Sequence, residues 1–147
     1  MKRAMLSLFF ASTAFASGSS QLRPLVDQNH VNGASCSFWL ANAKKPAKDY
    51  LQWDLLSAGW INLGGSDLKL TFVKDPRVPN PQDQLPLGHS RKREFSGHGV
   101  QVILRTRVTW LCPGNDDSCE AWREGGEIEV KMEKQRWKSQ IKGMCGS

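Results

Sequence analysis

Hydrophobic and polar residues alternate along most of the second half of the chain. The alternation covers residues 100–112, 127–133 and 136–145, with charged side chains at many of the intervening positions. Because successive side chains of a strand point to opposite faces, a period of two predicts half-buried strands and not helices. The side chains expected on the buried faces are Val100, Val102, Leu104, Val108, Trp110, Ile128, Val130, Met132, Trp137, Ile141 and Cys145.

The first half of the chain carries shorter segments of the same kind. Residues 60–63 and 67–73 flank a Gly-Gly-Ser stretch at 64–66, whose residue types suit a tight turn, so these segments predict a hairpin. Further strands are expected at residues 36–40 and 50–55. The side chains expected to face inward are Leu51, Trp53, Leu55, Leu68, Leu70 and Phe72.

Together these segments predict the fold class. No segment shows the 3.6-residue apolar stripe of a helix. The polar stretch 133–136 links two strands directly, which favours a second antiparallel hairpin. We therefore expect an all-β fold, either a single antiparallel β-sandwich or a small β-barrel of about seven strands, stapled by disulfides.

The N-terminal residues predict export. Lys2 and Arg3 precede a short apolar run, and Ala14-Phe15-Ala16 gives the small-x-small pattern that signal peptidase reads. The apolar run is shorter than the roughly 20 residues of a membrane-spanning helix. We expect residues 1–16 to be a cleaved signal peptide, which places the mature protein in the periplasm or outside the cell without a membrane span.

The remaining chain is expected to be one domain with a leader. Residues 17–35 are polar and aperiodic, which is typical of a flexible leader. Residues 36–147 form the single β-domain. Within it, residues 74–88 contain four prolines and predict a loop, because proline cannot contribute to a central strand.

Four cysteines in an exported chain of this length predict two disulfides. Cys112 and Cys119 are close in sequence, which favours a local bridge and leaves Cys36 to pair with Cys145. Paired ligands at zinc-site spacing do not occur. The sequence therefore predicts neither a metal nor another cofactor.

The stretch between the second pair of cysteines, CPGNDDSCE, has two interpretations. Asn115, Asp116, Asp117 and Glu120 offer oxygen ligands of the kind that calcium prefers. The loop is too short for the ligand spacing of an EF-hand, however, and each of its residue types has a local reason to occupy a turn. We interpret it as the stapled tip of a hairpin.

The charge of the chain favours a binding role and disfavours nucleic acid. Loss of Lys2 and Arg3 with the signal peptide reduces the net charge from +6 to +4. The dense basic cluster of the mature chain, residues 89–93, lacks the interleaved aromatic residues that stack on bases. Mild basicity is compatible instead with an acidic partner.

Four arginines are the candidate binding residues. Arg91 and Arg93 lie in the basic cluster, and Arg105 and Arg107 occupy the polar face of a predicted strand. If these segments are neighbours, the four guanidinium groups and the amino group of Lys92 form one positive patch for an acidic protein or glycan, because arginine binds carboxylate or phosphate with two hydrogen bonds. The alternative is a solvated sheet face whose charges prevent aggregation.

Trp122 is the remaining candidate binding residue. It follows the stapled turn, and surface tryptophans often mark binding sites, since a rigid amphipathic ring buries a large area. The same parity argument assigns Trp39 and Trp60 to polar faces or turns, so all three tryptophans are candidates for exposure.

An enzymatic alternative rests on His89, His98 and Glu94, which could supply a base or a metal site. No nucleophile elbow accompanies them. We therefore expect no catalytic residues and no enzyme activity. A purely structural role in the envelope is a further alternative.

The layout as a whole is similar to small periplasmic β-proteins that inhibit lysozymes or neutralise toxins. The similarity lies in the signal peptide, the all-β domain and the disulfides, and it covers architecture, not motifs. It implies a non-catalytic protein that binds a partner in the envelope or outside the cell, of the inhibitor or immunity type.

Overall fold

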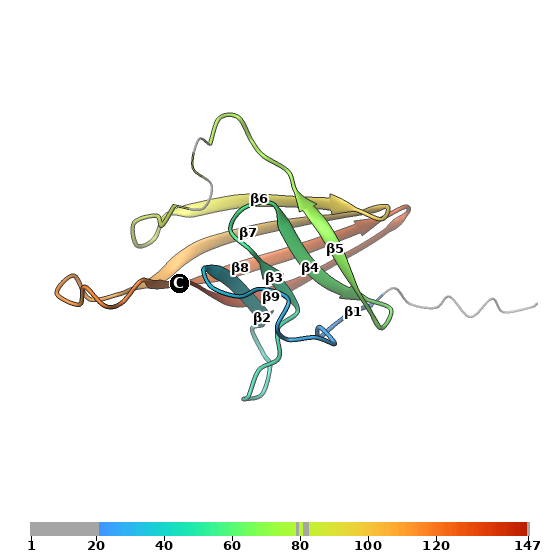
Figure 1. The fold of residues 1–147 in the computed structure, drawn as a ribbon. Coiled ribbons are helices and arrows are strands. Elements are labelled where there is room, and N and C mark those ends of the chain that lie inside the picture. Colours follow the sequence, from blue (N-terminus) through green and yellow to red (C-terminus); the bar gives the residue numbers. More distant parts are fainter. Residues whose placement is uncertain (1–20, 79, 81–82, 147) are drawn as a thin grey trace, which may run out of the picture.

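The computed structural model describes residues 21–78, 80 and 83–146, and these residues form strands and loops. Within these ranges no helix is long and apolar enough to cross a membrane. The expected all-β fold is confirmed, and the predicted signal peptide lies outside the described residues. The strands are β1 (Leu22–Arg23), β2 (Ser35–Leu40), β3 (Leu51–Trp53), β4 (Ala58–Leu63), β5 (Ser66–Phe72), β6 (Ser90–Gly97), β7 (Val100–Leu111), β8 (Ala121–Met132) and β9 (Gln135–Gly146) (Figure 1).

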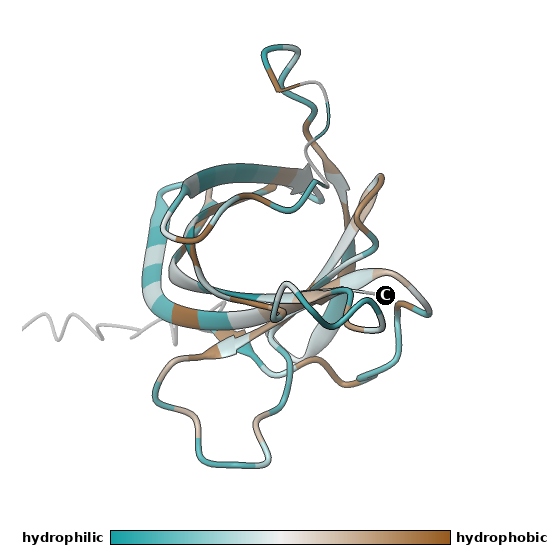
Figure 2. Cartoon of the chain, turned by 90° about the vertical axis from the view of Figure 1, so that its left-hand side faces the viewer, coloured by the Kyte–Doolittle hydropathy of each residue, from teal (hydrophilic) through white to brown (hydrophobic). Residues whose placement is uncertain are grey.

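Strands β2 to β9 form a closed barrel. Each strand is antiparallel to the next, and β9 pairs with β2, so eight strands enclose the interior. Figure 2 shows this ring of strands from one end. β1 lies outside the ring and pairs with the end of β4. Of the two predicted architectures the barrel is therefore correct, and both predicted hairpins are present as β4–β5 and β8–β9.

Apolar side chains fill most of the barrel interior. The rings of Trp53, Phe72 and Phe95 form a cluster with centroids 5.0 to 6.0 Å apart. Gly143 makes room for Phe38, since a Cβ atom at position 143 would lie 2.3 Å from its ring. The predicted inward faces of β3, β5, β8 and β9 are confirmed by the burial of Leu51, Trp53, Leu70, Phe72, Ile128, Val130, Ile141 and Cys145.

Two tryptophans lie on the faces opposite to those that the alternation predicts. The register between β7 and β8 shifts between Val108 and Trp110, which marks a β-bulge. The bulge reverses the parity of the strand, so Trp110 shares the outer face with Arg123, whose guanidinium carbon lies 5.1 Å from the ring centroid. Trp122 instead faces the interior and is only 6% exposed.

Both predicted disulfides are present. Cys36–Cys145 joins directly opposite residues of β2 and β9, the strand pair that closes the barrel. Cys112–Cys119 closes the turn between β7 and β8, which projects beyond the barrel near the C-terminal end (Figure 1). Two disulfides are compatible with an oxidising compartment.

Residues 21–34 belong to the segment predicted as a flexible leader, but they pack against the barrel. Leu22 is buried in the core cluster. On β5, the carboxylate of Asp67 accepts hydrogen bonds from two backbone N–H groups of the segment and lies 2.7 Å from Nε2 of His30. Burial alone would raise the pKa of Asp67, but these hydrogen bonds hold it below its usual value. Hydrogen bonds thus order a segment that has no apolar periodicity, which is why its pattern misled the prediction.

Candidate functional site

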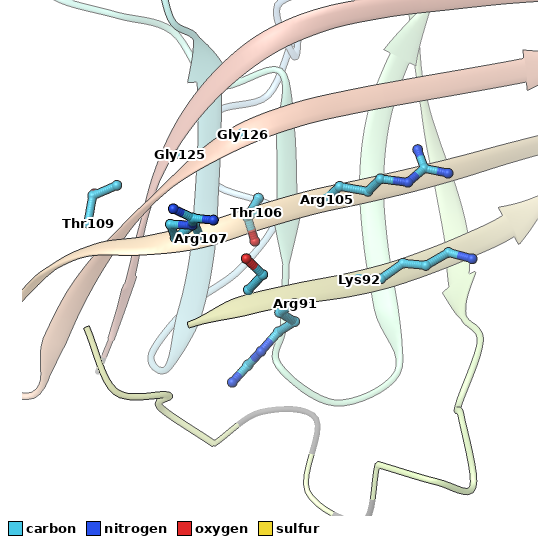
Figure 3. A pocket seen from close by; sticks show the side chains of 9 residues that line it. Arg91, Lys92, Arg105, Thr106, Arg107, Thr109, Gly125 and Gly126 are labelled. Atoms are coloured by element: carbon cyan, nitrogen blue, oxygen red, sulfur yellow. The ribbon is translucent and has the colours of Figure 1, made fainter. Parts of the chain in front are cut away.

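A shallow hollow on the outer face of β6, β7 and β8 is the candidate site. Its volume is about 600 Å³. Figure 3 shows cationic and hydroxyl side chains from β6 and β7 around two glycines of β8. The residues that line it are Ser90, Arg91, Lys92, Arg105, Thr106, Arg107, Thr109, Gly125 and Gly126.

The strand register brings the cations of the hollow together. Lys92 lies directly opposite Arg105, and Ser90 lies opposite Arg107. On the other side of β7, Arg107 lies opposite Gly125. Directly opposite residues have Cβ atoms about 5 Å apart, and like charges at such positions destabilise a sheet. The stability of the fold therefore gives no reason for this cluster of positive charge.

The cations of the hollow differ in their partners. Nη1 of Arg105 lies 3.4 Å from the Glu129 carboxylate and 3.9 Å from that of Glu127. Neither Lys92 nor Arg107 forms an ion pair with a residue that the structure describes. Arg107 therefore keeps its N–H donors for water or for a ligand.

Glu129 balances the positive charge on the neighbouring side of β8. Its side chain is 0% exposed because long cationic side chains cover it. Nε of Arg136 approaches its carboxylate to 2.5 Å, and the amino groups of Lys131 and Lys138 lie at 3.6 and 3.7 Å. Burial alone would raise the pKa of Glu129, but Arg136 and the lysines hold it below its usual value. The cations that this carboxylate pairs with are Arg105, Lys131, Arg136 and Lys138, and Arg107 is not among them.

Arg93, predicted as part of the surface patch, lies inside the barrel and is 2% exposed. Its guanidinium donates two hydrogen bonds to the carboxylate of Glu124, at 2.6 and 2.7 Å, and lies 5.1 Å from the Trp53 ring centroid. Thr106 and Trp122 donate to the same carboxylate at 2.6 and 2.8 Å. Burial alone would raise the pKa of Glu124, but Arg93, Thr106 and Trp122 together lower it to about 2.

The predicted patch is therefore split by the wall of the barrel. Arg105 and Arg107 lie on the outer face, whereas Arg93 and Trp122 are enclosed and cannot contact a partner there. The physical reason is the alternation of β6, which sends Arg91 and Arg93 to the side opposite Lys92. Lys92, which was predicted as part of the positive patch, lies on the outer face of β6 and lines the hollow.

Arg91 lies at the border of the hollow, and Figure 3 shows its side chain extending from β6 to the side away from β7. Its guanidinium donates to the backbone carbonyl of Asp83 in the proline-rich segment 74–88, whose described residues form no strand, as expected. Burial and the nearby charge of Arg93 lower the pKa of Arg91 to about 10. Arg91 thus anchors the segment that enters β6.

The residues of the enzymatic alternative do not converge. His89 precedes β6 and His98 follows it, which places them roughly 30 Å apart along an extended strand. The carboxylate of Glu94 accepts a hydrogen bond from the side chain of Gln101. No group of three or more His, Cys, Asp or Glu residues in the described ranges could hold a metal ion. In the CPGNDDSCE turn, Asp116 accepts hydrogen bonds from the backbone and hydroxyl of Ser118, as a turn residue does.

Gly125 and Thr109 are among the site residues that the sequence pattern did not reveal. Glycine carries no information about which face of a strand it occupies, and the bulge beside Thr109 shifts the alignment of β7 with β8. The Gly125-Gly126 pair within a charged stretch was the one available signal, since glycine inside a strand often marks a close approach.

Comparison of the chain with protein-family models, with curated proteins and with solved structures finds no match.

Proposed function

We propose that the chain is an exported, non-catalytic protein that binds an acidic protein partner through the outer hollow. The observation that carries this proposal is a pair of exposed cations, Lys92 and Arg107, that form no ion pair with the described residues and lie beside the hydroxyls of Ser90 and Thr109. Such a set of donors suits carboxylates, because arginine and hydroxyl groups can share the two oxygens. Binding of this kind would suit a protein of the inhibitor or immunity type, which acts by covering a site on its partner.

The composition of the hollow favours a protein over an acidic glycan. No aromatic side chain is among the residues that line it, whereas a flat ring is the usual platform for a sugar. Arg105 and Arg107 are two positions apart on β7, which spaces their Cα atoms by about 7 Å. Carboxylates on alternate residues of an extended acidic segment have the same spacing.

Export is supported by the sequence pattern of residues 1–16 and by the two disulfides. The barrel supplies a frame for the hollow, because β7 and β8 are each paired on both sides along most of their length, and β6 is paired with β7 throughout. A pre-formed site loses little conformational entropy on binding.

The test compares a double variant of the hollow with a matched control. Residues 17–147 are immobilised, and binding of poly-L-glutamate and of heparin is measured by interferometry over a range of salt concentrations. Arg105→Ala/Arg107→Ala removes two charges from the hollow. Lys44→Ala/Lys48→Ala removes two exposed charges from the loop between β2 and β3.

We expect the hollow variant to weaken binding of poly-L-glutamate about tenfold, since each exposed pair contributes roughly 0.5–1 kcal/mol. The control should change binding less than about twofold and the affinity should fall with salt. Equal losses in the two variants would show that net charge alone attracts the polymer and would overturn the proposal. Binding of heparin without binding of poly-L-glutamate would assign the hollow to a glycan instead.

A further inference from the structure

We propose that Gly125 is the floor of a slot in which one carboxylate of the partner lies against Arg107. This inference rests on the proposed function and names its central contact. The absence of a side chain at Gly125 would leave the space that this carboxylate occupies. Three observations support it: the strand register, the contrast between two adjacent glycines, and the partners of the two arginines of the hollow.

The register places Gly125 between two cations on the outer face. Arg107 lies directly opposite it on β7, and Lys142 lies directly opposite it on β9. Gly125 faces outward because the preceding residue, Glu124, faces the interior. A gap one side chain wide therefore separates two positively charged positions, of which Arg107 lines the hollow.

The two adjacent glycines differ in what the fold demands of them. A Cβ atom at position 126 would lie 2.0 Å from the backbone oxygen of Arg105, so a side chain there would force the β7 backbone to shift. A Cβ atom at position 125 would lie 3.6 Å from Cγ2 of Thr109, an ordinary contact, and Gly125 has no positive φ. Neither space nor backbone conformation requires glycine at position 125, although glycine inside a strand reduces stability. A ligand that approaches the backbone provides the missing reason.

The partners of the two arginines show which one is free to bind. Arg105 is held by Glu129, whereas Arg107 has no carboxylate partner among the described residues. The hydroxyl residue Ser90 lies directly opposite Arg107 on its other side, and Thr109 adjoins the slot. A carboxylate above Gly125 would thus meet a bidentate guanidinium and neighbouring hydroxyl donors.

The experiment supplies the carboxylate from within the chain. Gly125→Glu puts a carboxylate directly opposite Arg107, so it should occupy the slot and weaken binding of poly-L-glutamate at least tenfold. Gly125→Gln fills the same volume without charge and should weaken binding about threefold. Gly114→Glu adds the same charge in a turn where a side chain meets open space, and it should change binding less than twofold.

A second pair of variants tests the same contact by replacing the two arginines one at a time. Arg107→Met should weaken binding of poly-L-glutamate about fivefold, whereas Arg105→Met should weaken it about twofold or less, because Glu129 already engages Arg105. This pair leaves Gly125 unchanged and decides the matter if Gly125→Glu does not fold.

The outcomes separate this inference from the proposed function. If Arg105→Ala/Arg107→Ala abolishes binding while Gly125→Glu binds like the wild type, the slot is wrong and the proposed function stands. If neither variant alters binding, both are wrong. An effect of Arg105→Met as large as that of Arg107→Met would also overturn the slot.

Discussion

Two arginines on neighbouring strands, Arg93 inside the barrel and Arg107 outside it, have opposite surroundings. Arg93 meets the carboxylate of Glu124 with two hydrogen bonds and is 2% exposed. Arg107 is exposed and has no ion pair with any residue described. A buried charge without a partner destabilises a protein strongly, whereas water solvates an exposed one. Arg93 therefore serves the fold, whereas Arg107 remains available to a partner.

The interior pair is also saturated. Glu124 accepts hydrogen bonds from Arg93, Thr106 and Trp122, so its oxygens have little capacity left for a ligand. Replacing both members of a buried ion pair by apolar residues often costs little stability. Removing one member alone is costly, because the other charge is then buried without a partner. Loss of the Glu124 charge should therefore destabilise the fold more than loss of a charge on the outer face.

The largest effect is expected from Glu124→Gln. The substitution keeps the shape of the side chain but leaves the charge of Arg93 buried without a counter-ion. We expect the free energy of unfolding to fall by about 3–5 kcal/mol in urea denaturation. The matched change Glu127→Gln, on the outer face of the same strand, should cost less than about 1 kcal/mol. Similar losses at the two positions would remove the distinction between the interior and the surface.

The second effect is a dependence of stability on pH. The pKa of Glu124 is lowered from 4.5 to about 2 in the folded protein, so its ionised form stabilises the fold. This stabilisation is fully present above the pKa of the unfolded chain and is lost as pH falls from about 4.5 towards 2. Its size is about 3 kcal/mol, from 1.36 kcal/mol for each pKa unit.

Urea denaturation at a series of pH values checks this expectation. Asp67 and Glu129 also have lowered pKa values, so the wild type alone would not isolate Glu124. Glu124→Gln lacks the titrating group, and the difference between its stability and that of the wild type should shrink as pH falls. A difference that stays constant down to pH 2 would contradict the assignment.

The same interior charges explain which strands the sequence pattern predicts and which it does not. β7 and β9 are apolar on their inner faces over most of their length, and their alternation is readable. β6 places Arg91 and Arg93 on the inner side, so it reads as a basic cluster and not as a strand. The first half of β8 places Glu124 inside and continues with two glycines, which again hides the period of two.

The site was only partly predictable for a related reason. Arg105 and Arg107 followed from the parity of β7 before the bulge, and their position on the outer face agrees with that parity. Beyond the bulge the parity reverses, which sends Trp110 outward. The pairing of Arg107 with Gly125 depends on the register between β7 and β8, which the sequence of either strand alone does not reveal. The site is formed by neighbours on different strands, whereas alternation indicates only which face of its own strand a side chain occupies.

The smallest effects concern the two glycines and have opposite signs. Gly126→Ala forces a Cβ atom against the β7 backbone and should lower the free energy of unfolding by about 2–3 kcal/mol. Gly125→Ala meets only ordinary contacts and should raise it by about 0.5–1 kcal/mol, because alanine restricts the unfolded chain. Urea denaturation of the two variants measures both changes. A loss at position 125 as large as that at 126 would mean that the fold itself requires glycine there, and Gly125 would then give no reason to look for a ligand.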